Sequence, residues 1–338
     1  MIAVFVFAGN IVLADQKPKT VAEVALYKGA DRQQILEEGA RKEGKLTFYT
    51  THILNPLHIN AFRKKYPYIK VEVWRASGIK LLPRITEEYK VGRHICDLVE
   101  ATQTGMMVLQ KGGIVRPFYS PNLAYIEEGA IKKAQGGGVL AAGTRLSGIG
   151  MGYNTKLITK EEVPKTHQDL LDPKWKGKMA IGAQWSGVSW MGSMLVTYGE
   201  DFVRRMAKQN FDVHMVSGRG ILDMVIAGEY MFSPSMFDSH VWKSKEKGAP
   251  VDWLPIAPVP ALLSQVALPK HPSSPHATLL LIDFYLSKED AKISKATGYS
   301  PSRKDASGEK TYKKFYGAKS VKEKIKWDNL FNRLFLKR

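Results

Sequence analysis

The loops after the first three predicted strands carry polar residues that could bind an anion. These residues are Thr51 and His52, Ser77 and Gly78, and Thr102. Hydroxyl groups and unpaired backbone N–H groups at the start of a helix can hold a carboxylate, phosphate or phosphonate. Thr51 and Ser77 could also simply cap their own helices, as such residues commonly do. Three such loops converging on one cleft favour a ligand site.

Two loops in the second half of the chain could complete this site. Gln184, Trp185 and Ser186 follow a predicted strand, and Arg219 stands between two glycines before a predicted helix. A guanidinium can hold an oxyanion through two parallel hydrogen bonds, and the glycines let the backbone approach a ligand closely. Arg219 could also be a surface residue in a turn, and Trp185 could serve packing between domains rather than stacking on a ligand.

The sequence gives no sign of catalytic chemistry. It contains no phosphate-binding Walker loop, no Gly-x-Ser-x-Gly elbow and no His-Glu-x-x-His pair, so we expect no enzyme activity, no cofactor and no metal site. The adjacent Thr51 and His52 are the one candidate pair for an exported hydrolase. The single cysteine, Cys96, lies in an apolar run and is predicted to be a buried strand residue.

The predicted elements that position these loops form two α/β units. From residue 45 onward, short β-rich segments alternate with helical ones, a pattern typical of parallel strands joined by helices. The alternation begins again after an extended segment over residues 148–155, and a Pro- and Val-rich segment over 250–268 is predicted to return to the first unit. A chain of 338 residues favours two domains.

Charge and the first residues indicate where the protein works. Residues 1–14 form a short apolar run that ends in Val-Leu-Ala, which is typical of a secretory signal peptide cleaved before Asp15. The alternatives are an uncleaved anchor or a buried first strand.

The net charge of +18 would suggest nucleic-acid binding in a cytoplasmic protein, but export argues against it. Residues 304–338, basic with interleaved aromatics, are predicted to form a solvated helix whose aromatic side chains pack inward.

Five segments together resemble the ferric-iron-type branch of the family 1 extracellular solute-binding proteins. They are residues 27–32 (YKGADR), 37–46 (EEGARKEGKL), 227–230 (AGEY), 247–253 (KGAPVDW) and 298–303 (GYSPSR). The resemblance implies a two-lobed periplasmic-binding-protein fold of type II, with two crossover strands as the hinge. We expect residues 15–147 with 262–338 to form the first lobe and residues 148–261 to form the inserted second lobe.

The same resemblance raises the question of iron. Iron-binding members of the family hold Fe³⁺ through two adjacent tyrosines shortly after the Gly-Glu of the second lobe. The corresponding residues 236–240 (MFDSH) contain no tyrosine and offer Asp238 alone. Since a hard trivalent cation needs several anionic oxygen ligands, this departure argues against iron.

These observations predict a periplasmic, monomeric solute receptor that passes its ligand to the membrane permease of an ABC importer. The expected ligand is a small organic anion held between Ser77-Gly78 and Arg219, with Thr51 and Gln184 adding hydrogen bonds. A ferric-ion or metal-chelate receptor is the alternative within transport.

Overall fold

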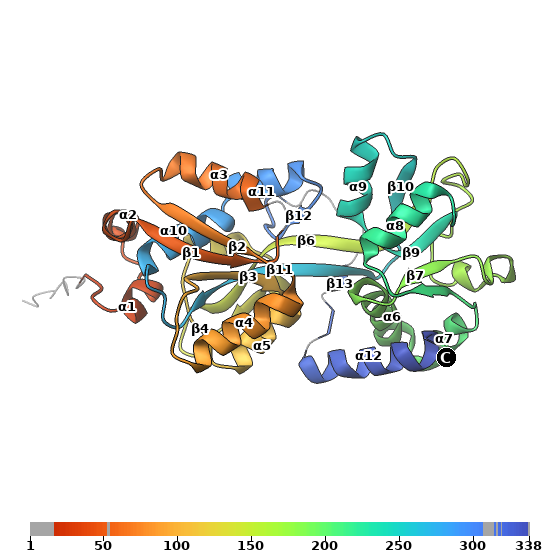
Figure 1. The fold of residues 1–338 in the computed structure, drawn as a ribbon, viewed down its shortest axis with the longest axis horizontal. Helices are drawn as coiled ribbons and strands as arrows, with labels where there is room; N and C mark the ends of the chain where they lie inside the picture. The colour runs from red at the N-terminus through yellow and green to blue at the C-terminus, as the bar shows by residue number, and fades with distance from the viewer. Residues whose placement is uncertain (1–16, 53–54, 307–313, 316, 319, 337–338) are drawn as a thin grey trace, which may run out of the picture.

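The structure, a computed structural model, describes residues 17–52, 55–306, 314–315, 317–318 and 320–336. The predicted signal peptide, residues 1–14, lies outside the described residues. Two α/β lobes lie side by side, and the antiparallel strands β6 (Val139–Asn154) and β11 (Val259–Pro269) run from one lobe into the other (Figure 1). This arrangement confirms the predicted two-lobed fold with two crossover strands.

The first lobe is a sheet in the order β2-β1-β3-β11-β6 with helices on both faces. Its elements are α1 (Val21–Leu26), α2 (Arg32–Glu43), β1 (Lys45–Thr50), α3 (Asn55–Lys65), β2 (Lys70–Arg75), α4 (Gly78–Lys90), β3 (Leu98–Thr102), α5 (Gln103–Lys111), β4 (Val115–Arg116), β5 (Ile131–Lys133), α10 (Pro275–Tyr285), α11 (Lys288–Ala296) and β12 (Ser300–Pro301). One apolar core joins the sheet to α2, α3 and α10, and a second joins the opposite face to α4 and α5. Helix α2 ends at Gly44, because Gly44 takes the left-handed conformation (φ +67°) that closes the helix.

The second lobe is built on the far half of β6. Its elements are β7 (Ala180–Gly182), α6 (Trp185–Tyr198), α7 (Glu200–Ala207), β8 (Asp212–His214), α8 (Gly218–Ala227), β9 (Phe232–Phe237), α9 (Asp238–Glu246) and β10 (Val251–Leu254). Strands β9 and β10 both pair with β6, whereas β7 pairs with β8 in a separate small sheet. The main core of this lobe lies between the sheet and α6 and α7.

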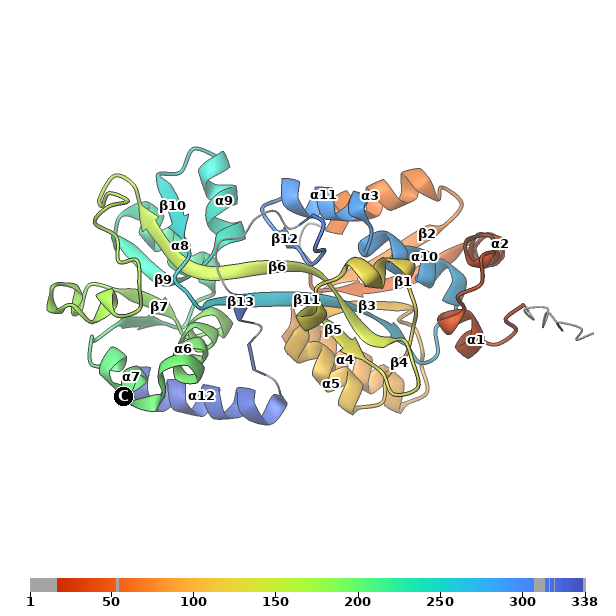
Figure 2. The ribbon, with the colours of Figure 1, turned by 180° about the vertical axis from the view of Figure 1, so that it is seen from behind.

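The C-terminal helix corrects one predicted lobe boundary. After β13 (Lys314–Phe315), which pairs with β11, helix α12 (Val321–Phe335) packs on α6 and α7 (Figure 2). Its buried side chains Trp327, Phe331 and Phe335 belong to the second-lobe core. Assigning residues 321–335 to the first lobe was therefore wrong, although the inward packing of these aromatics was predicted. Within the described residues, no helix has both the length and the apolar character needed to cross a bilayer.

Candidate ligand-binding cavity

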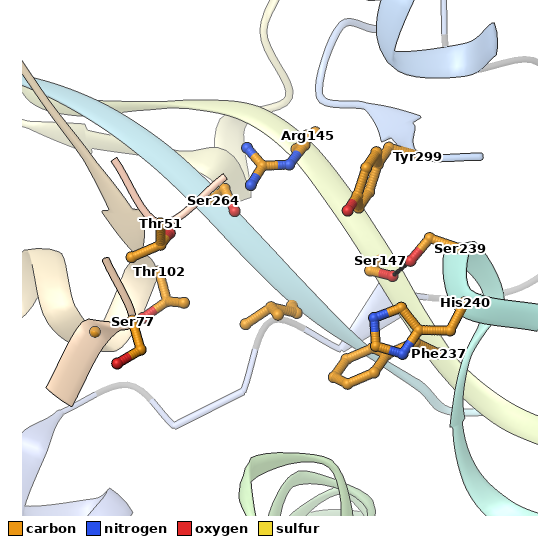
Figure 3. Close-up of a pocket in the computed structure, with 12 residues that line it drawn as sticks. Thr51, Ser77, Thr102, Arg145, Ser147, Phe237, Ser239, His240, Ser264 and Tyr299 are labelled. Carbon is orange, nitrogen blue, oxygen red and sulfur yellow. Dashed lines mark hydrogen bonds between the residues drawn. The ribbon is translucent and has the colours of Figure 1, made fainter. Parts of the chain in front are cut away.

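A cavity of about 250 Å³ lies between the two lobes, against the crossover strands (Figure 3). Its floor comes from alternate residues of those strands. Arg145 on β6 pairs with Ser264 on β11, and Ser147 pairs with Leu262. Because side chains alternate between the two faces of a strand, these four side chains share one face of the sheet. The floor is therefore built from residues that also form the hinge.

The first-lobe wall of the cavity consists of Thr51, Ser77, Gly78 and Thr102. They follow β1, β2 and β3, as the sequence predicted. Thr102 caps α5 by accepting a hydrogen bond from the Gly105 backbone N–H at 3.3 Å, whereas the Ser77 side chain makes no capping bond. A side chain at Gly78 would meet no atom within 4 Å, so this helix start faces open space. The N-terminus of α4 is therefore accessible to a ligand, and its dipole favours an anion.

The second-lobe wall is formed by Phe237, Ser239 and His240 at the start of α9. The Ser239 hydroxyl lies 2.5 Å from that of Ser147, and Asp238 accepts hydrogen bonds from the Ser147 hydroxyl at 2.9 Å and from the Ser239 backbone N–H at 2.6 Å. These bonds tie the start of α9 to strand β6. Figure 3 shows the rings of Phe237 and His240 opposite Thr51, Ser77 and Thr102.

Among the described residues that line the cavity, Arg145 is the one lysine or arginine. Its Nη1 contacts the carboxylate of Glu100, which is fully buried and also accepts a hydrogen bond from the Thr50 hydroxyl. Burial by itself would lower the pKa of the guanidinium, but the Glu100 carboxylate outweighs this and holds the pKa above its usual value. Within the described part of the chain, Arg145 Nε and Nη2 make no hydrogen bond, so two donor groups remain for a ligand. The guanidinium carbon lies 5.1 Å from the ring centre of Tyr299, another residue that lines the cavity.

Two histidines near the cavity are neutral at pH 7. Burial, reinforced by Arg219 and Lys243, lowers the pKa of His240 to about 4. His52 lies behind Thr51, almost fully buried, and burial followed by Arg145 holds its pKa well below the usual value. Neither ring nitrogen of His52 has a hydrogen-bond partner among the described residues, so Thr51 and His52 do not form a nucleophile–base pair.

The remaining predicted site residues do not line this cavity. Gln184, Trp185 and Ser186 begin α6, which follows β7 in the small sheet rather than a strand of the main sheet. Trp185 instead stacks on Phe237, with ring centres 6.0 Å apart. Asp238 does not line the cavity, but its hydrogen bonds hold the lining residues Ser147 and Ser239 in position.

Arg219 needs a correction of its own. Its Nη2 pairs with Asp223 at 2.7 Å, one turn along α8, and its Nη1 donates to the Ser244 hydroxyl at 2.8 Å. The side chain is half exposed and engaged with its own lobe. Arg219 does not line the cavity, whereas Arg145 does.

Eight lining residues were not predicted from the sequence: Arg145, Ser147, Phe237, Ser239, His240, Leu262, Ser264 and Tyr299. A signal was available for Arg145, which is the single charged residue in the sixteen residues of β6. A buried cation in such a strand is costly unless it is paired or functional. Ser264 and Tyr299 carry no comparable local signal, because strand register and the α11–β12 turn bring them to the cavity.

The chemistry of the lining favours an oxyanion. No Asp or Glu side chain lines the cavity, and no cluster of three or more potential metal-ligating His, Cys, Asp or Glu exists within the described residues. Arg145, several hydroxyl groups and the start of α4 all present donors to one space. The fold and this cavity define a two-lobed solute-binding protein of the periplasmic-binding class.

Comparison with known proteins establishes the family. The family of bacterial extracellular solute-binding proteins matches residues 106–334, more than half of the chain, and the chain belongs to it. A search of curated protein sequences found no match.

Solved structures share the fold at low sequence identity. Iron-bound HitA from Pseudomonas aeruginosa is 19% identical with a TM-score of 0.70, over 86% of this chain and 99% of that one. Trichodesmium IdiA (FutA) with iron and citrate is 18% identical with a TM-score of 0.70, over 87% and 100%. AfuA from Actinobacillus pleuropneumoniae with fructose-6-phosphate is 20% identical with a TM-score of 0.68, over 87% and 99%. At these identities the similarity shows a shared fold and does not identify the ligand of this protein.

Proposed function

We propose that this solute-binding protein captures a small organic oxyanion between its lobes and delivers it to the membrane permease of an ABC importer. The observation that carries the proposal is the inter-lobe cavity with Arg145 on its floor and no acidic side chain in its lining. An oxyanion placed there would accept hydrogen bonds from Arg145 Nε and Nη2, from nearby hydroxyls and from the start of α4. The fold neighbours include a protein bound to iron and one bound to fructose-6-phosphate, so ligand class varies among proteins of this fold.

Capture would involve closure of the two lobes. The first-lobe wall supplies Thr51, Ser77 and Thr102, and the second-lobe wall supplies Phe237, Ser239 and His240. A ligand that touches both walls binds the closed arrangement more tightly than an open one, so binding shifts the population toward closure. The permease would then recognise the closed form. A receptor of this kind works outside the cytoplasm, in keeping with the signal peptide predicted over residues 1–14.

The alternatives fit the cavity less well. A bare ferric ion would find the phenol of Tyr299 and the imidazole of His240, without the set of anionic oxygens it needs. A hydrolase would need an activated nucleophile, and His52 does not bond to Thr51. Binding without turnover is therefore the function that the lining supports best.

The test compares three classes of candidate ligand by thermal unfolding: small organic anions, spermidine as an organic cation, and ferric nitrilotriacetate. A true ligand raises the melting temperature by mass action, because it binds the folded protein and not the unfolded chain. We expect a rise with members of the anion class and a smaller radius of gyration in solution scattering with the same compounds. Stabilisation by spermidine alone, or a visible charge-transfer band with ferric ion, would overturn the proposal.

A further inference from the structure

The two walls of the cavity differ in chemistry. Thr51, Ser77 and Thr102 present hydroxyl groups from the first lobe, whereas Phe237 and His240 present rings from the second (Figure 3). Leu262 adds a further apolar side chain from β11. A ligand that spans the cavity must therefore match donors on one side and an apolar, aromatic surface on the other.

The ring of Phe237 is held as a rigid platform. The indole of Trp185 stacks on it with an interplanar angle of 16°, and the His240 ring lies 5.0 Å from it, steeply tilted at 65°. Gly218 leaves room for this ring, because a Cβ at position 218 would lie 3.1 Å from Phe237 Cδ2. Phe237 also lines the cavity while remaining 9% exposed. A ring fixed in this way loses little conformational freedom when a ligand stacks on it.

A ligand covered with hydroxyl groups suits this second wall poorly. Hydroxyls buried against Phe237 and Leu262 would lose their hydrogen bonds to water without replacement, which is unfavourable. A planar apolar body would instead gain burial and ring contacts. The cavity of about 250 Å³ is smaller than typical drug-binding pockets, which suits one ring with its charged substituent.

We propose that the ligand is an aromatic oxyanion, with its charged group at Arg145 and its ring against Phe237. This inference rests on the proposed function, since it places the anionic group at the same guanidinium. His240 Nδ1 is buried and has no hydrogen-bond partner within the described residues. A polar substituent on the ligand ring would satisfy that nitrogen.

The first test uses matched pairs of probes that share a charged group and differ in the rest of the molecule. Calorimetry of the wild-type protein would compare benzoate with acetate, phenyl phosphate with glucose 6-phosphate, and benzenesulfonate with methanesulfonate. We expect at least one aromatic member to bind about tenfold or more tightly than its partner. Equal or tighter binding of the non-aromatic members would overturn the inference while leaving the anion receptor intact. If no anion of either kind binds, the proposed function itself fails.

The second test uses variants at the platform. Phe237→Leu keeps an apolar side chain and removes the aromatic face, so the affinity for the preferred aromatic probe should fall about tenfold, and that for its partner should change less than about twofold. Tyr125→Leu, at a half-exposed position outside the cavity, is the matched control and should leave both affinities unchanged. An equal loss for both probes, or no loss for either, would contradict stacking on Phe237. If Phe237→Leu does not fold, the wild-type pairs still decide the question.

Discussion

The guanidinium of Arg145 on β6 reaches across β11 to the buried carboxylate of Glu100 on β3. The pair therefore joins a crossover strand to the central sheet of the first lobe, directly behind the cavity. Because Glu100 holds Nη1 of the guanidinium, Nε and Nη2 are held in a defined orientation and remain available as donors. The contact with Glu100 thus both positions the Arg145 guanidinium and neutralises its charge.

Removing one member of this pair should destabilise the fold more than removing both. Glu100→Ala leaves Arg145 buried without its counter-charge, and we expect a loss of about 3–5 kcal/mol in the free energy of unfolding. The double variant Glu100→Gln with Arg145→Met replaces both charges and should recover most of that loss. Urea unfolding of the three proteins measures this. A double variant as unstable as Glu100→Ala would show that the pair is not the cause.

Substitutions at Arg145 and Arg219 should differ in their effect on binding affinity. Arg145→Lys keeps the charge but loses the planar donor edge, so the affinity for the anionic ligand should fall by about 1.4–2.7 kcal/mol, roughly ten- to a hundredfold. Arg219→Ala removes a side chain that is engaged with Asp223 and Ser244 and should change the affinity less than about threefold. Calorimetric titration compares them. A large loss in Arg219→Ala with none in Arg145→Lys would restore the assignment made from sequence.

Acid should destabilise the second lobe through His167. This side chain is fully buried between Trp190 and Tyr198, and burial, opposed by the Ala257 carbonyl, lowers its pKa to about 4. The unfolded chain binds a proton near pH 6.5 and the folded protein does so only near pH 4. The stability that the folded protein gains by keeping His167 neutral is therefore fully present above pH 6.5. About 3 kcal/mol of the free energy of unfolding is lost as the pH falls toward 4.

The variant His167→Phe isolates that contribution. It fills a similar volume without a titratable group, so its stability should fall less than that of the wild type between pH 6.5 and 4. Denaturant unfolding at several pH values gives both curves. Parallel curves would mean that His167 does not cause the acid sensitivity.

The C-terminal helix depends on a glycine contact. A Cβ at Gly192 on α6 would lie 2.2 Å from Cε3 of Trp327 on α12, so Gly192→Ala should cost about 1–3 kcal/mol through overpacking. Adding Trp327→Leu makes space and should reduce the penalty of the alanine. Thermal unfolding and limited proteolysis near residue 320 report the change. If Gly192→Ala leaves the stability unchanged, α12 can shift freely on α6.

The fold was largely predictable because local patterns repeat along the chain. Alternating strands and helices indicated two α/β units, and the first-lobe loops at Thr51, Ser77 and Thr102 follow directly from the rule that ligands lie at the carboxyl ends of strands. The placement of α12 was not predictable in this way, because an apolar helix face can pack on either lobe, and its contacts with α6 and α7 appear only in the tertiary structure.

The rest of the site depends on relationships that one sequence does not display. Ser147 and Ser264 reach the floor through the register between β6 and β11, which is set by pairing far apart in the chain. Arg219 had the right residue type and flanking glycines, but its neighbours Asp223 and Ser244 compete for the guanidinium. Arg145 was recognisable as a lone charge in an apolar strand, but its pairing with Glu100 can be seen only in the tertiary structure.

Native mass spectrometry of the protein after incubation with a bacterial metabolite extract tests most directly whether the protein binds an organic anion through Arg145. We expect a retained organic anion in the wild-type protein and in Arg219→Ala. The same anion should be absent from the double variant Glu100→Gln with Arg145→Met. A retained metal ion or organic cation, or no retained solute in the wild type, would contradict an anion receptor built on Arg145.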